Sequence, residues 1–126
     1  MNLTQLKERL KILAENNVIS FRSAELTTQA STQLQQALHS DNIPNSEMLF
    51  THLSTAITRI ERGEEIGAPM PEILTEIKTS KYYSEVVQQV NFIESIYGSN
   101  LPTEELDYLM IHYTNVYQQN EGGSNE

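Results

Sequence analysis

Apolar residues recur at intervals of three and four along nearly the whole chain, which is the spacing of one face of an α-helix. In the first segment, Leu3, Leu6, Leu10 and Leu13 fall on one side of such a helix. The same spacing marks further helical segments over about residues 20–38, 46–62, 71–79, 84–97 and 102–117. The sequence therefore predicts an all-α fold, a compact bundle of about five helices joined by short loops.

Residues typical of helix ends agree with the boundaries of these predicted helices. Ser20 or Ser23 is expected to cap the second helix, because a hydroxyl oxygen can accept a hydrogen bond from a free amide of the first turn. Gly63 and Gly98 follow the third and fifth helices, and glycine readily adopts the left-handed conformation in which helices often end. The stretch 64–71, which is rich in glycine and proline, is expected to be a connector.

The length of 126 residues fits a single domain with one core. We place this domain at residues 1–117, where the helical spacing ends. Residues 118–126 are polar and have nothing to bury, so we expect a flexible C-terminal tail there.

Charge and composition exclude several classes of function. The chain carries 8 Lys and Arg against 17 Asp and Glu, a net charge of −9. Such a charge repels nucleic-acid phosphates and anionic membranes, so we expect neither as a direct partner. The sequence has no cysteine, which excludes disulfides, thiolate nucleophiles and cysteine-type zinc sites. Without a signal-like N-terminus or a long apolar run, we expect a soluble, cytoplasmic protein.

Histidine is then the main reactive side chain, and the chain has three. His39 lies in a polar stretch and is expected to be a solvated loop residue. His52 lies three residues after Leu49, and His112 lies three residues after Leu109, so both border an apolar helix face. Taken singly, each of these two is compatible with a satisfied histidine at the edge of the core.

The neighbours of His52 and His112 change that interpretation. Arg59 follows His52 by seven residues and Glu105 precedes His112 by seven, which is two helical turns or about 10 Å along one face. If the two helices pack antiparallel with the histidines level, Arg59 lies beside Glu105. A histidine pair and a charged pair would then line one seam between helices. The alternative is that Arg59 and Glu105 are solvated charges.

Metal binding and catalysis find less support. His52, His112 and Glu105 could supply nitrogen and oxygen ligands, but no HExxH-like cluster is present, and a spacing of seven residues is too long for one ion. The sequence also lacks a nucleophile elbow and a glycine-rich phosphate cradle. We therefore predict no metal, no cofactor and no enzyme activity; an enzyme using either histidine as a general base would need a pocket with convergent polar groups.

Two segments carry a resemblance to a known family. Residues 50–63 (FTHLSTAITRIERG) and 101–112 (LPTEELDYLMIH) resemble the two half-signatures of the PTS regulation domain, or PRD, as found in antiterminators. That family's pattern is a histidine and an arginine two turns apart, followed at long range by Glu-x-x-Tyr-(Leu/Ile)-x-x-His. The resemblance extends over about residues 47–116. The positions that match are His52, Arg59, Glu105, Tyr108 and His112.

The resemblance implies a five-helix bundle that often forms a homodimer. It also implies that His52 and His112 are phosphorylated by the sugar phosphotransferase system, with HPr or a sugar-permease component as the donor. Arg59, Glu105 and Tyr108 are the supporting residues on this interpretation.

The chain has room for one such domain and shows no basic effector module. We therefore expect a stand-alone regulatory PRD that acts through protein–protein contacts, with a partner regulator, in the transcriptional regulation of carbohydrate use. The alternative is a passive helical dimerisation or interaction module that has lost phosphotransfer.

Overall fold

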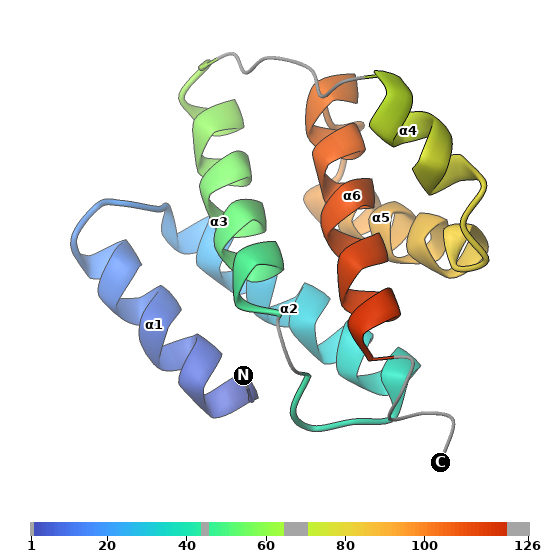
Figure 1. The fold of residues 1–126 in the computed structure, drawn as a ribbon. Coiled ribbons are helices and arrows are strands. Elements are labelled where there is room, and N and C mark those ends of the chain that lie inside the picture. Colours follow the sequence, from blue (N-terminus) through green and yellow to red (C-terminus); the bar gives the residue numbers. More distant parts are fainter. Residues whose placement is uncertain (1, 44–45, 65–70, 121–126) are drawn as a thin grey trace. The chain divides into compact units, whose positions relative to one another are not determined.

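A computed structural model describes residues 2–43, 46–64 and 71–120 of the chain. Within these ranges the backbone forms six α-helices and no β-strand, apart from an isolated bridge between Asn2 and Asn42 (Figure 1). The helices are α1 (Leu3–Glu15), α2 (Phe21–Leu38), α3 (Glu47–Glu61), α4 (Pro71–Lys78), α5 (Tyr83–Tyr97) and α6 (Thr103–Gln119). The prediction of an all-α fold is confirmed, with six helices instead of about five.

The helices belong to two compact units, Met1–Glu65 and Ile66–Glu126. In the first unit α2 packs against both α1 and α3. In the second unit α6 packs against both α4 and α5. None of the helices in the described ranges is long and apolar enough to cross a membrane.

The first unit is held together by the apolar stripes that the sequence spacing indicates. Each of its helices turns one row of side chains inward, and burial of a leucine or isoleucine side chain contributes about 1.5–3 kcal/mol. Buried members of these rows include Leu6, Leu10, Ala14, Leu26, Ala30, Leu34, Leu49, Leu53 and Ile57. Because α3 buries three of these residues, its rotation about its own axis is fixed.

The second unit has a more aromatic interior. Val86 and Ile93 of α5 are fully buried, as are Leu109 and Tyr113 of α6. The short helix α4 buries Ile77. The core of this unit therefore centres on α5 and α6, with α4 attached through fewer buried side chains.

The helices of the first unit end in the same way. The residue after the last turn takes a positive φ angle at Asn17 (60°), His39 (53°) and Gly63 (73°). At His39 the backbone NH of Ser40 donates to the carbonyl of Gln35 at 3.1 Å, the long-range bond of a Schellman motif. The stop predicted at Gly63 is confirmed, whereas Asn17 and His39 adopt a conformation that L-residues with a Cβ usually avoid.

The remaining boundaries are close to the predicted ones. Ser20 caps α2, since its hydroxyl oxygen accepts a hydrogen bond from the NH of Ser23 at 3.1 Å. Gly98 ends α5 with a φ angle of 94°. α6 continues to Gln119, two residues beyond the predicted end of the domain. Most of the predicted connector (65–70) and the end of the predicted tail (121–126) lie outside the described residues.

Replacing His39 by glycine is expected to stabilise the protein by about 0.5–1 kcal/mol, because glycine has no Cβ to strain the left-handed conformation. Urea unfolding of His39→Gly beside His39→Ala measures this effect, since the alanine variant removes the imidazole and keeps the Cβ. If both variants unfold at the same urea concentration, the positive φ angle carries no strain.

Candidate functional site

Helix α3 carries the first half of the predicted site. His52 and Arg59 are both half-buried on this helix, and their separation of seven residues places them on one face about 10 Å apart. Leu49 and Leu53, which are fully buried, lie on the adjoining face. The histidine and the arginine are therefore held at the edge of the core, where part of each side chain remains accessible.

A chain of hydrogen bonds pins the opposite face of α3 to the start of α2. The Ser23 hydroxyl donates to the Ser54 carbonyl at 2.5 Å, and the Thr58 hydroxyl donates to the same oxygen at 2.8 Å. The backbone NH of Ser20 donates to the Thr58 hydroxyl at 3.0 Å, and the Ser20 hydroxyl donates to Glu61 Oε1 at 2.6 Å. These bonds fix the segment of α3 that separates His52 from Arg59.

The end of α3 fixes the backbone at Arg59. The NH of Glu64 donates to the Arg59 carbonyl at 3.0 Å, and the NH of Gly63 donates to the Ile60 carbonyl at 3.1 Å. Together these bonds form a complete Schellman motif around Gly63. Arg59 thus lies in the last turn, where the negative end of the helix dipole favours a cation.

Helix α6 carries the second half of the predicted site. Glu105 lies in its first turn and is only 2% exposed. Burying a carboxylate costs several kcal/mol without compensation, and the positive end of the helix dipole favours the charge at this position. Tyr108 and His112 are half-buried and one turn apart on the same face as Glu105.

Burial lowers the pKa of His112 from the ordinary value of 6.5. The cause is loss of hydration, which disfavours the charged imidazolium. At neutral pH the ring is therefore uncharged and keeps a lone pair on one nitrogen. Such an imidazole can act as a nucleophile or as a hydrogen-bond acceptor.

Buried aromatic and amide groups hold α6 against α5. Tyr113 is fully buried, and burial raises its pKa. Burial also raises the pKa of Tyr117, and the nearby charge of Glu85 acts in the same direction, while a hydrogen bond from the Gln89 side chain opposes the shift. The Tyr117 ring also meets that of Tyr82, with 5.7 Å between centroids. The phenols of Tyr113 and Tyr117 stay protonated at neutral pH, and together these contacts orient the helix that carries His112.

The structure thus assembles each half of the predicted site on one helix. His52 and Arg59 share a face of α3, whereas Glu105, Tyr108 and His112 share a face of α6. The two helices belong to separate units, α3 to the first and α6 to the second. The seam in which His52 meets His112 and Arg59 meets Glu105 stays a prediction.

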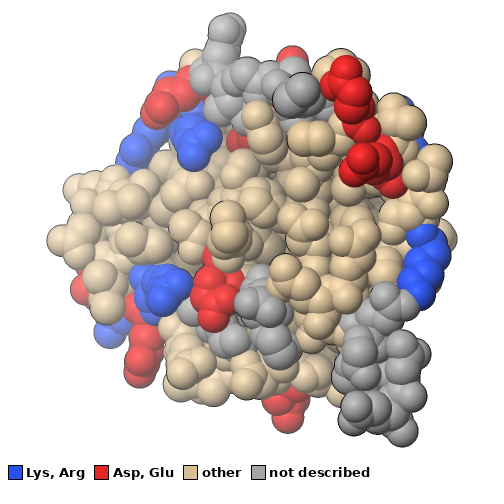
Figure 2. Space-filling view, in the orientation of Figure 1, with Lys and Arg blue, Asp and Glu red and all other residues tan. Residues whose placement is uncertain are grey.

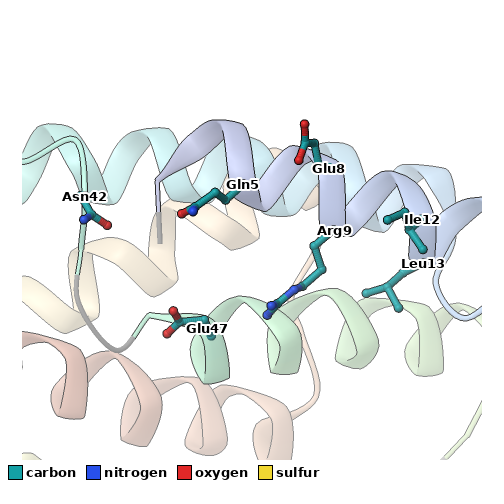
Figure 3. A pocket seen from close by; sticks show the side chains of 7 residues that line it. All are labelled: Gln5, Glu8, Arg9, Ile12, Leu13, Asn42 and Glu47. Atoms are coloured by element: carbon teal, nitrogen blue, oxygen red, sulfur yellow. The ribbon is translucent and has the colours of Figure 1, made fainter.

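The first unit also contains an open cavity of about 520 Å³ between α1, Asn42 and the start of α3. Figure 3 shows Arg9 and Leu13 extending from α1 toward α3, with Glu47 at the beginning of α3. The five predicted site residues are not part of its lining. This cavity is therefore separate from the histidine face of α3.

Charged side chains leave much of the surface neutral. On the face shown in Figure 2, Lys and Arg occur as separate groups, and broad uncharged areas lie between them. Among the described residues, no group of three or more His, Asp or Glu side chains is arranged to hold a metal ion.

Several buried polar residues near the packed faces of the helices were not predicted from the sequence. Ser23, Thr27 and Ser31 are buried and repeat every four residues, so they form a polar stripe on α2. Thr58 and Gln89 are also buried, one on the face of α3 opposite the histidine and the other against α6. The four-residue repeat in α2 was the available signal, because a stripe of small hydroxyl residues at that spacing can face a neighbouring helix.

The family described as "PRD domain" matches residues 24–116. This range contains His52, Arg59, Glu105, Tyr108 and His112, and α1 precedes it. No curated protein and no solved structure gave a significant match.

The lowered pKa of His112 predicts a specific dependence of stability on pH. The unfolded chain binds a proton on this residue more tightly than the folded chain, so the free energy of unfolding is expected to fall as pH drops below about 6.5 and to be insensitive to this residue well above that value. His112→Gln should lose less stability than the wild type between pH 7.5 and 5.5 in urea unfolding. If His112→Gln and the wild type lose equal amounts of stability over this pH range, the lowered pKa of His112 is contradicted.

Proposed function

Because the chain belongs to the PRD domain family, whose members are regulatory domains of the sugar phosphotransferase system, we propose that His52 and His112 are its phosphoryl acceptors. The observation that carries the proposal is the placement of each histidine, half-buried at the edge of a helix face whose other side is packed. Part of each side chain is accessible to a donor protein, whereas the Nε2 atom of His52 is itself buried. A side chain in this position can also transmit a change to the core.

The chemistry requires a neutral imidazole. A ring nitrogen with a free lone pair attacks the phosphorus atom of the phosphorylated donor, a phosphorus–nitrogen bond forms, and the bond from phosphorus to the donor breaks. The lowered pKa of His112 favours this form at neutral pH. HPr or a sugar-permease component is the proposed donor.

The supporting residues have distinct proposed roles. Arg59 is a long cation two turns from His52, and a guanidinium can pair with phosphate through two parallel hydrogen bonds. Tyr108 lies one turn before His112 and is placed to orient the ring or its phosphate. Glu105 is buried in the first turn of α6, two turns before His112. We propose that Glu105 limits the positions that a phosphoryl group on His112 can adopt.

The output of the proposed switch is a change in protein contacts. A phosphoryl group adds a charge of about −1.5 to −2 and three acceptor oxygens. At the edge of a packed face, the added negative charge attracts arginine side chains and repels carboxylates. We propose that the change alters self-association or contact with a partner regulator, in a cytoplasmic protein that controls transcription for carbohydrate use.

Phosphotransfer tests the proposal directly. After incubation with phosphoenolpyruvate, enzyme I and HPr, or with a phosphorylated permease component, mass spectrometry is expected to find acid-labile phosphate on the wild type. His52→Ala and His112→Ala should each lose one phosphorylation site, and the double variant should lose both. His39→Ala is the control and should accept phosphate like the wild type.

A wild-type protein that stays unphosphorylated by both kinds of donor would contradict the proposal. The passive interaction module would then be the better description. Phosphate that persists in the double variant would place the acceptor elsewhere in the chain.

A further inference from the structure

The second unit contains a groove whose walls come from three helices. α4, α5 and α6 enclose a volume of about 210 Å³ there. Ile77, Val87, Leu106 and Met110 form its apolar lining, with Tyr83 at the start of α5. Tyr83, Val87, Leu106 and Met110 keep part of their surface exposed. Apolar side chains from these three helices are therefore only partly covered by the other described residues of the second unit.

The apolar strip continues past the groove along α4. Ile73 lies one turn before Ile77 and is 39% exposed. An apolar trough between helices is the usual docking surface for one face of an amphipathic helix. Met110 suits such a role, because its unbranched side chain adapts to the shape of an incoming group.

The polar residues of the groove indicate the charge of the occupant. Glu94 of α5 and Asp107 of α6 line the groove, and Lys78 of α4 is the single cation among the described residues that line it. Glu94 Oε2 accepts a hydrogen bond from the NH of Leu101 at 2.8 Å, which holds this carboxylate in place. Over residues 71–120 the chain has seven Asp and Glu against two Lys. A segment rich in Lys and Arg therefore complements this surface, and an acidic segment is repelled.

The groove uses a different face of α6 from the predicted histidine site. At 100° per residue, Leu106 and Met110 lie about 100–160° around the helix axis from Glu105 and His112. A ligand in the groove therefore does not compete for the accessible side of His112. The same helix nevertheless connects both surfaces.

We propose that the groove formed by α4, α5 and α6 docks a basic amphipathic helix of a partner protein. Apolar side chains of that helix enter between Ile77, Val87 and Met110, and its Lys and Arg residues meet Glu94 and Asp107. This inference goes beyond the proposed phosphoryl transfer, because it concerns a surface that holds none of the five predicted site residues.

A synthetic peptide tests the charge and shape of the groove on the whole 126-residue chain. The probe is an amphipathic helix of about 15 residues, with leucine on one face and lysine on the other. A matched peptide with glutamate in place of lysine is the control. Fluorescence anisotropy at physiological salt is expected to show binding of the lysine peptide at least about tenfold tighter than that of the glutamate peptide.

Substitutions locate the binding surface. Asp107→Lys is expected to weaken binding of the lysine peptide about fivefold, and Met110→Gln about tenfold, with helical content unchanged by circular dichroism. Glu85→Lys makes the same change in charge on the exposed, opposite face of α5 and should leave the affinity near that of the wild type. Phosphotransfer to His52 and His112 should be unaffected in all three variants, which separates this inference from the proposed function.

The proposal fails if the lysine peptide does not bind, if both peptides bind equally, or if Glu85→Lys weakens binding as much as Asp107→Lys does. Amide chemical-shift changes confined to residues 71–110 would support the groove. Changes spread over the first unit would overturn it, because they would indicate a general attraction to the acidic chain.

Discussion

A separation of seven residues on one helix is the constraint on which the candidate site depends. It places His52 with Arg59 on α3, and Glu105 with His112 on α6, on single faces two turns long. Each face borders a row of buried side chains that fixes the rotation of its helix. The histidines are consequently half-buried, which gives them a packed environment and access to a partner at once.

Much of this arrangement could be predicted from the sequence, because helix periodicity is a local property. The apolar repeats located the helices, and Gly63 and Gly98 marked the ends of α3 and α5. The positions of His52 and His112 at the edges of apolar faces also followed from spacing alone. The family match over residues 24–116 agrees with the half-signatures that contain them.

Other features depend on contacts between helices or on backbone geometry, which spacing does not reveal. The hydrogen bonds from Ser23 and Thr58 to one carbonyl of α3 arise only when α2 and α3 meet. The left-handed conformation of His39 has no signal comparable to glycine. The near-complete burial of Glu105 was also unexpected, because charged residues usually stay in water.

The proposed phosphoryl transfer requires that His52 and His112 accept phosphate while His39 does not. Nitrogen-15 NMR of histidine-labelled protein distinguishes the three imidazoles, because each gives its own signals. During phosphorylation by HPr or a permease component, the signals of His52 and His112 are expected to change to those of phosphorylated rings, and His39 is expected to keep its own. Unchanged signals at both positions, or phosphorylation of His39 alone, would contradict the proposed transfer.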